Sequence, residues 1–251
     1  WKINRKFVFL ASLNRNSFIK KLIRQPYFPD FKYDVRAYCV YVRTFYFCQN
    51  LFILNNLLIF IKNPEKGKVK TRIAKTAGDE RALSIYHELL RHTREVALQV
   101  DARRILFYSD RINGQDEWQS QDFQKMVQHG ADLGERMSNA FILGLIRPDD
   151  KAVIIGSDCP QLTPEIIHTA FQKLDEYPYV IGPTTDGGYY LLGMTKHTRS
   201  LFDNIEWSTG AVFAQTIKRI EALDASYFTL PKLTDVDYEE DWQQYGWEIK
   251  K

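Results

Sequence analysis

The fold of this chain is decided by residues 152–160, whose sequence is AVIIGSDCP. An unbroken apolar run that closes on a glycine is typical of a strand buried on both faces. Asp158 would follow that strand at its carboxyl end, the edge where open α/β sheets bind ligands. Thr163 and Pro164 then predict the N-cap and the first residue of a helix. An equally simple explanation is that Asp158 only hydrogen-bonds its own turn.

Strands and helices alternate on both sides of this stretch. Apolar runs predict strands at residues 57–61, 105–108, 152–155, 179–181, 189–192 and 227–230. Helical patterns fall between them, at residues 79–99, at 133–145, after 163 and at 211–222. This alternation favours the α/β class, with a mainly parallel sheet in a single three-layer α/β/α domain. We therefore predict one domain over residues 54–251.

Residues 1–53 differ in composition from the rest of the chain. The first fifty carry ten Lys and Arg, two Asp, no Glu or Gly, and thirteen aromatic side chains. They lack the apolar core and small-residue cleavage site of a signal peptide. We interpret residues 1–53 as a non-native or accessory basic aromatic extension, with a membrane-surface or partner-binding arm as the alternative. We expect no nucleic-acid partner, because basic charge and aromatics alone, without a known module, are weak evidence for one.

The rest of the composition is that of an ordinary globular protein in a reducing compartment. Cys39, Cys48 and Cys159 form neither a CxxC pair nor a metal-ligand spacing, which argues against a disulfide framework and a structural zinc site. No run of about 18 apolar residues occurs, so we expect no stable membrane insertion. A cytoplasmic location fits best. Nothing in the pattern selects an oligomeric state.

The loop after the first predicted strand, residues 62–72, carries five cations around a proline and a glycine. A loop at the carboxyl end of a strand that offers cations and backbone N–H groups can cradle phosphates. We therefore assign Lys62, Gly67, Lys70 and Arg72 to nucleotide binding, with Lys70 and Arg72 as the preferred ligands. Neither GxxxxGK[ST] nor GxGxxG occurs, and a solvated basic loop is the alternative.

A second candidate stretch is residues 128–137, QHGADLGERM, which leads into a predicted helix. Its glycines would let the backbone approach a flat ligand, and the Gln128 amide could hydrogen-bond the edge of a base. We assign Gln128, Gly134 and Arg136 to nucleotide binding. A loop with a helix cap, in which Arg136 pairs with a surface acid, explains the pattern equally well.

Two further loops suit a substrate. In residues 182–190, GPTTDGGYY, Asp186 precedes two glycines in a predicted tight turn, and its carboxylate could contact a sugar or phosphate. A plain hairpin turn is the alternative. Residues 206–210, EWSTG, form a polar aromatic loop, although Trp207 could equally be a core residue. These loops supply the candidate substrate-binding residues Gly187, Gly188, Trp207, Ser208 and Thr209.

Acidic residues near the carboxyl terminus are candidates for a metal site. Residues 239–241 are explained by the favourable placement of acids at a helix start. Asp235 and Asp237 come earlier, and either could join Asp158 on a cation. Magnesium commonly takes one or two protein carboxylates plus substrate phosphates. We therefore predict Asp158, Asp235 and Asp237 as ligands of Mg²⁺ or Mn²⁺.

Six stretches together resemble the DUF2064 family in their order: KNPEKGKVKTR, GADLGERM, GSDCP, GPTTDGGYYLLG, EWSTG and TDVD. Members of that family are described as glycosyltransferase A-like or selenodomain-associated transferases, within the nucleotide-diphospho-sugar transferase superfamily. The resemblance covers residues 57–247 and implies the GT-A fold, with Asp158 as the metal-binding Asp of a shortened DxD motif. Pro160 stands where a full DxD motif has its second acid, which resembles the single-Asp nucleotidyltransferases instead.

The resemblance implies a metal-dependent transferase that uses a nucleotide-activated donor. We expect a glycosyltransferase that acts from an NDP-sugar on a small-molecule acceptor, with Asp158 and Asp186 as catalytic residues. The second hypothesis is a nucleotidyltransferase, similar to guanylyltransferases, that moves NMP from an NTP to a phosphorylated small molecule. The third is a non-catalytic nucleotide-binding protein on the same fold.

Overall fold

The computed structural model describes residues 54–249, so the predicted extension at residues 1–53 lies outside the described residues. In the described part, seven strands form one sheet in the order β3-β2-β1-β4-β6-β5-β7. β6 runs antiparallel to its neighbours β4 and β5, and the other pairings are parallel. The predicted α/β class with a mainly parallel sheet is confirmed. The strands are β1 (Asn55–Ile61), β2 (Arg103–Tyr108), β3 (Gln124–Val127), β4 (Lys151–Ile155), β5 (Tyr179–Pro183), β6 (Tyr189–Met194) and β7 (Tyr227–Thr229).

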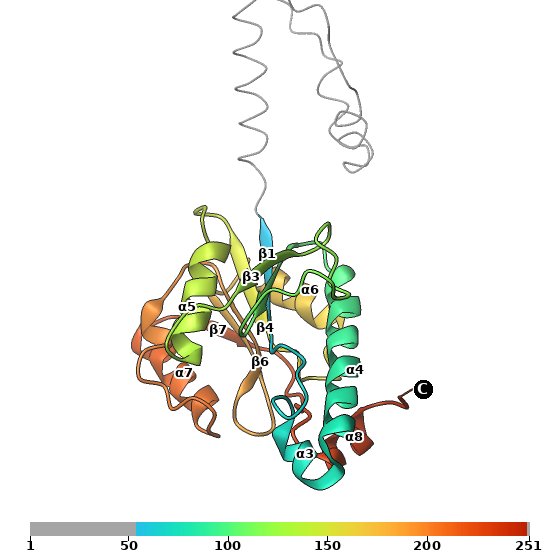
Figure 1. Ribbon diagram of the computed structural model, residues 1–251. Coiled ribbons are helices and arrows are strands. Elements are labelled where there is room, and N and C mark those ends of the chain that lie inside the picture. The colour runs from blue at the N-terminus through green and yellow to red at the C-terminus, as the bar shows by residue number, and fades with distance from the viewer. Residues whose placement is uncertain (1–53, 250–251) are drawn as a thin grey trace, which may run out of the picture. The chain divides into compact units, whose positions relative to one another are not determined.

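Helices cover both faces of this sheet, which gives the predicted three-layer arrangement (Figure 1). Helices α4 and α6 lie on one side of the strands, and α5 and α7 lie on the other. The short helices α3 and α8 lie together near one end of α4. The helices are α3 (Thr71–Ala77), α4 (Asp79–Leu98), α5 (Leu133–Gly144), α6 (Pro164–Lys173), η3 (Arg199–Leu201, a 3-10 helix), α7 (Val212–Ala222) and α8 (Glu239–Tyr245).

The central strands are apolar on both faces because helices cover them on both sides. Leu57 and Ile59 of β1 pack in the cluster that α4 and α6 share. Leu58, between them, packs in the cluster that contains Phe141 of α5. Successive side chains of a strand point to opposite faces, so a doubly covered strand needs an unbroken apolar run. The same reasoning explains residues 152–155 of β4, whereas Lys151 at its start is buried with its ammonium group paired to Asp175.

Two elements and one helix cap differ from the sequence-based expectation. β3 is a short, partly exposed strand at the sheet edge, and its polar residues gave no apolar run. Helix α3 begins inside the predicted basic loop without a side-chain cap, and its buried Ile73 packs in a cluster with Val236 and Trp242. Thr163 occupies the N-cap position of α6, but its side chain makes no capping hydrogen bond. Pro164 opens that helix as predicted.

The antiparallel strand β6 brings several loops to one edge of the sheet. β1 and β4 both end there because they are parallel, and β6 begins there because it runs against β4. The backbone N–H of Gly156, just after β4, donates to the carbonyl of Tyr190 at 3.3 Å. The backbone N–H of Val236 donates to the carbonyl of Asp158 at 2.9 Å. Loops that are far apart in the sequence therefore meet at the edge where α/β sheets bind ligands.

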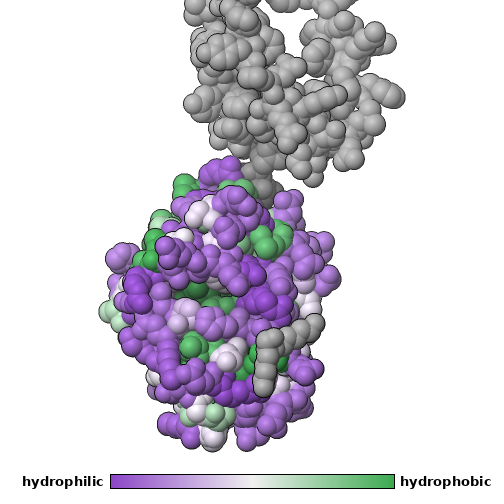
Figure 2. All heavy atoms as spheres, turned by 45° about the vertical axis from the view of Figure 1, so that its right-hand side comes forward, coloured by the Kyte–Doolittle hydropathy of each residue, from purple (hydrophilic) through white to green (hydrophobic). Residues whose placement is uncertain are grey.

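The outer surface of the described part is polar on the face that Figure 2 draws. The face drawn in Figure 2 is mostly hydrophilic, with hydrophobic residues visible in small groups. Among the helices of residues 54–249, none combines the length and the apolar character needed to cross a membrane.

Candidate active site

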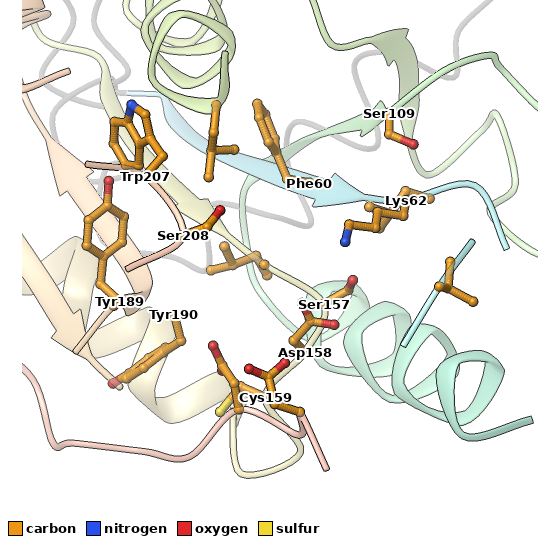
Figure 3. Close-up of a pocket in the computed structure, with 18 of the residues that line it drawn as sticks. Phe60, Lys62, Ser109, Ser157, Asp158, Cys159, Tyr189, Tyr190, Trp207 and Ser208 are labelled. Atoms are coloured by element: carbon orange, nitrogen blue, oxygen red, sulfur yellow. The ribbon is translucent and has the colours of Figure 1, made fainter. Parts of the chain in front are cut away.

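A cleft of about 650 Å³ opens at this edge of the sheet. Figure 3 shows Lys62 and Ser109 on one side of it, Asp158 near the middle and Trp207 on the opposite side. Clefts of this volume bind small molecules and cofactors. Most of the candidate residues line it: Lys62, Lys70, Arg72, Gln128, Arg136, Asp158, Asp186, Gly188, Trp207, Ser208, Thr209, Asp235 and Asp237. Gly67, Gly134 and Gly187 lie outside this lining.

Lys70 and Asp158 form an ion pair at the floor of the cleft. The Lys70 Nζ atom lies 2.5 Å from Asp158 Oδ1 and donates to the Val236 carbonyl at 2.7 Å. The Lys70 side chain is only 6% exposed, whereas that of Asp158 is 44% exposed. Lys70 also has a left-handed backbone (φ 47°), uncommon for a residue with a side chain. The fold thus fixes the cation and leaves the carboxylate open to the cleft.

Asp235 is a partly buried acid with an incomplete set of partners. Its Oδ1 atom is buried and has no hydrogen-bond partner among the described residues. Burial, and next the negative charge of Asp158, raise the pKa of Asp235 to about 8. Lys70 opposes this rise, but does not cancel it. The positive charge near Asp158 and Asp235 is therefore too small to keep both carboxylates ionised at neutral pH.

This pair fits a divalent cation, although the predicted set of three acids is not gathered. In residues 54–249, no three His, Cys, Asp or Glu side chains are grouped as metal ligands. Asp237 instead forms an ion pair with Arg72. The unpartnered Asp235 oxygen and the raised pKa of that acid fit the coordination of a positive ion. Two carboxylates with phosphate oxygens and water would suit Mg²⁺ or Mn²⁺.

Tyr86 of α4 ties the basic loop to the Asp158 turn, and the sequence analysis missed it. Its hydroxyl accepts a hydrogen bond from the Lys62 backbone N–H at 2.8 Å. The same oxygen lies 3.3 Å from Ser157 Oγ and 3.1 Å from the Lys62 carbonyl oxygen. Tyr86 occupies one position in the apolar face of a long helix, so its spacing carried no signal of a site.

The predicted nucleotide-binding residues of the first two loops have mixed surroundings. Gly67 lies in a tight turn with φ 76°, next to a backbone hydrogen bond from Lys68 to Glu65. The Gln128 side-chain N–H₂ group donates to the carbonyls of Ile61 and Phe107, at 3.1 and 3.2 Å. Those two bonds hold the ends of β1 and β2 together. Gln128 thus lines the cleft with its amide donor already engaged.

Arg136 has one partner of its own that keeps it near the cleft. Its Nε atom donates to the Gly130 carbonyl at 3.1 Å, which ties the first turn of α5 to the loop before it. A Cβ atom on Gly130 would lie 2.7 Å from the Arg136 backbone nitrogen. The loop therefore needs glycine for close packing against α5.

Asp186 both stabilises its own turn and lines the cleft. Asp186 Oδ1 accepts from the Gly188 N–H at 3.0 Å and from Thr184 Oγ1 at 2.5 Å, as in an ordinary Asx turn. Asp186 Oδ2 has no hydrogen bond within the described part of the chain, and Asp186 lines the cleft. Gly187 has φ 90°, and a Cβ atom there would lie 2.1 Å from the Gly210 carbonyl oxygen. This contact packs the turn directly against the Trp207 loop.

The Trp207 loop is held from three sides. The Glu206 N–H donates to Gln215 of α7, and Thr209 Oγ1 donates to the Glu206 carbonyl at 2.7 Å. A Cβ atom on Gly134 would lie 2.6 Å from the Trp207 indole nitrogen. Gly134 therefore serves the site indirectly, because its missing side chain leaves room for the indole.

Comparisons with known proteins show the family to which the chain belongs. The sequence profile described as "Uncharacterized protein conserved in bacteria (DUF2064)" matches residues 92–209. A crystal structure from Desulfovibrio desulfuricans G20, described as a "putative nucleotide-diphospho-sugar transferase", is 30% identical, with a TM-score of 0.68. The match covers 74% of this chain and 84% of the other. The chain belongs to the DUF2064 family. The predicted family resemblance is confirmed.

Other solved structures share the fold of this DUF2064 protein at lower identity. A 4-diphosphocytidyl-2C-methyl-D-erythritol synthase is 11% identical with a TM-score of 0.52, and covers 77% of this chain and 97% of its own. The synthase of the same name from Anaerococcus prevotii DSM 20548 is 9% identical with a TM-score of 0.50, and covers 77% and 95%. These likenesses show a common fold. Among curated proteins, none matches the sequence of this DUF2064 chain.

Proposed function

We propose that this DUF2064 protein is a metal-dependent glycosyltransferase that acts from an NDP-sugar on a small-molecule acceptor. One observation carries the proposal. A cation, Lys70, and two acids, Asp158 and Asp235, line a cleft of about 650 Å³ at the carboxyl edge of the sheet, and Lys70 offsets only part of the negative charge of the acids. The Desulfovibrio relative, whose description names a nucleotide-diphospho-sugar transferase, supports this class of donor.

The chain's own cations would hold the diphosphate of the donor. Lys62, Lys70 and Arg72 line the same cleft and come from one loop and the start of α3. Preorganised cations stabilise the charge that develops on a leaving phosphate group. Tyr86 keeps the start of this loop against the Asp158 turn, so that cations and carboxylates keep a fixed spacing.

Asp158 and Asp235 would hold the divalent ion. When bound, Mg²⁺ or Mn²⁺ supplies charge neutralisation on the phosphate oxygens of the donor. Asp186 would act on the other reactant, because its Oδ2 atom is without a partner among the described residues and it lines the cleft. That oxygen can accept a proton or a hydrogen bond from a hydroxyl group, which is what an attacking acceptor needs.

Product analysis tests the reaction class. The full chain would be incubated with UDP-, GDP- and CDP-linked sugars in the presence of Mg²⁺ or Mn²⁺, with released NDP and free or transferred sugar measured by chromatography. Asp158→Asn should reduce turnover at least about a hundredfold, the range seen when one electrostatic group is removed from an active site. The surface variant Lys75→Met, on α3 outside the cleft lining, is the matched control. Equal turnover in Asp158→Asn and the unaltered chain would contradict the assignment.

Pro160 favours a second candidate, nucleotidyl transfer. Because of Pro160, the GSDCP turn carries a single acid, as in the single-Asp nucleotidyltransferases that it resembles. The second acid, Asp235, comes from a different segment of the chain. In that reaction a phosphorylated acceptor would attack the α-phosphate of an NTP, and pyrophosphate would leave. Pyrophosphate release from an NTP, with no NDP formed from NDP-sugars, would select this candidate. Binding of nucleotides without either product would select the non-catalytic hypothesis.

A further inference from the structure

The two ends of the cleft differ in chemical character. Lys62 and Ser109 lie at one end, and Ser157 and Asp158 lie near the middle (Figure 3). Trp207, Tyr189 and Ser208 lie together at the other end. A nucleotide diphosphate needs cations along its phosphates, which the proposed function places at the Lys62 end. The Trp207 end is left for the rest of the donor or for the acceptor.

The Trp207 end combines an apolar surface with polar groups that are not engaged. Of the apolar lining residues, Met137 contacts the Tyr189 hydroxyl there, and Leu133 adjoins Gly134, which packs against the indole. In residues 54–249, neither the Trp207 indole N–H nor Ser208 Oγ has a side-chain hydrogen bond. Within the described part of the chain, the Tyr189 hydroxyl has a single hydrogen-bond partner, the Met137 sulfur at 3.8 Å. Burial raises the pKa of Tyr189, so its hydroxyl stays neutral and keeps its proton.

These groups are held in place before any ligand binds. The Gln215 side chain bonds the backbone N–H and the carboxylate of Glu206, both at 3.0 Å, and so anchors the loop to α7. Gly134 of α5 packs against the edge of the indole. Ser208 has φ 65°, a backbone conformation that a side-chain-bearing residue adopts only when its surroundings impose it. A rigid aromatic surface with fixed donors lowers the entropy cost of binding.

We propose that the Trp207 end of the cleft is a subsite for an uncharged cyclic polyol, such as a pyranose ring. One face of such a ring presents C–H groups that pack on an aromatic surface, and its hydroxyls need fixed donors and acceptors. Trp207 offers the aromatic surface, Ser208 and Tyr189 offer hydroxyls, and Asp186 Oδ2 offers an acceptor. This inference rests on the proposed function for its biological setting, but not for its test.

Other ligands match these groups less well. A purely apolar ring would leave the Trp207 N–H and two hydroxyls without partners in a partly desolvated site, which costs free energy. An acceptor with a phosphate or carboxylate here would meet the charge of Asp186 at close range. The polyol could be the sugar of the donor or a separate acceptor. The two sources share one chemistry, and the experiment distinguishes them.

Saturation-transfer NMR on the full chain tests the subsite without a nucleotide. The probes are methyl α-D-glucopyranoside and myo-inositol, with benzyl alcohol and glucose 6-phosphate for comparison. We expect transfer to the ring protons of an uncharged polyol, weak transfer to the other two probes, and loss of the polyol signal in Trp207→Leu. Trp207→Phe should keep part of the signal, because it keeps an aromatic face. Trp247→Phe, which lies outside the cleft lining, is the control.

A second variant covers the case in which Trp207→Leu unfolds. Gly134→Ala keeps every cleft side chain, but its new methyl group would lie 2.6 Å from the indole and push it aside. Alanine is the better helix former. The new methyl group would also lie 2.8 Å from the Phe202 carbonyl oxygen, so a lower Tm is expected, and circular dichroism checks that the variant is folded. The proposal predicts that Gly134→Ala loses the polyol signal while it remains folded. Polyol transfer that survives in both Trp207→Leu and Gly134→Ala, or none in the unaltered chain, would overturn it.

Calorimetry with UDP against UDP-glucose, and GDP against GDP-mannose, identifies the source of the ring. If the donor's sugar binds here, Trp207→Leu should weaken the NDP-sugar by roughly tenfold, about 1.4 kcal/mol, and leave the NDP unchanged. If the acceptor binds here, both ligands should keep their affinity, and methyl glucopyranoside should bind tighter once NDP is present. Absence of nucleotide binding with an intact polyol signal would defeat the proposed function and leave this subsite standing.

Discussion

Replacing Asp235 with Asn should stabilise this protein while it weakens the proposed metal site. Burial and Asp158 raise the pKa of Asp235 to about 8, from an ordinary value of 3.8. Each pKa unit is worth about 1.4 kcal/mol, so the charged form costs the folded state on the order of 5 kcal/mol at about pH 9. The new amide in Asp235→Asn would lack a hydrogen-bond partner, which lowers the stability of the variant by roughly 1–3 kcal/mol. The expected net gain is about 2–4 kcal/mol, or a Tm higher by roughly 4–16 °C.

The gain should depend on pH in one direction. The folded pKa of Asp235 lies above the unfolded value, so the unaltered protein loses stability as pH rises from about 4 towards 8. At about pH 4.5 the linked cost falls to roughly 1 kcal/mol, and Asn should give no advantage there. Thermal unfolding in a chelating buffer at about pH 4.5 and about pH 9 measures both values. Added Mg²⁺ at the higher pH should then stabilise the unaltered protein more than Asp235→Asn.

Asp237→Asn is the matched control, because it removes the same charge two residues away. Asp237 is paired with Arg72, so its removal should give no stabilisation at high pH. The reasoning would be refuted if Asp235→Asn shifted the Tm equally at both pH values. It would also be refuted if Asp235→Asn destabilised the protein at the higher pH.

Three further predictions follow from single contacts. Lys70→Met should weaken nucleotide diphosphate binding at least tenfold by calorimetry, because it removes the buried cation at Asp158; Lys75→Met should not. His92→Gln should reduce the fall in Tm between about pH 7 and pH 5, because burial lowers the pKa of His92 and its protonation opposes folding as pH drops below 6.5. Gly187→Ala should cost about 2–4 kcal/mol in urea unfolding, because a left-handed φ and the Gly210 carbonyl both exclude a Cβ atom.

Much of the fold was predictable because central strands carry long apolar runs. β1, β4 and α4 lie within two residues of their predicted bounds, because the two strands are buried on both faces and the helix buries one regular face. β3 and α3 were not predicted. Neither sequence contains a long apolar run, and each element forms because of its tertiary contacts: β3 pairs with β2, and Ile73 of α3 packs in the cluster of α8.

The edge that holds the site was predictable, but the pairing of its side chains was not. A carboxylate that follows a buried strand must lie at the carboxyl edge, which places Asp158 from sequence alone. No spacing rule shows that Arg72 pairs with Asp237, or that the Gln128 donor is turned to the ends of β1 and β2. Those contacts join residues more than 20 positions apart and depend on the packing of whole elements. Tyr86 was not predicted as a site residue, because its position fits the ordinary apolar face of a helix.

The most direct test of the account is the metal dependence of nucleotide binding at Asp158. Calorimetric titration of the full chain with UDP, GDP and CDP would be made in Mg²⁺ or Mn²⁺ and again in EDTA, for the unaltered protein and Asp158→Asn. The account predicts that one diphosphate binds in the presence of metal, that EDTA weakens it by at least about tenfold, and that Asp158→Asn removes this metal dependence. Binding of equal strength with and without metal, unchanged by Asp158→Asn, would contradict the account.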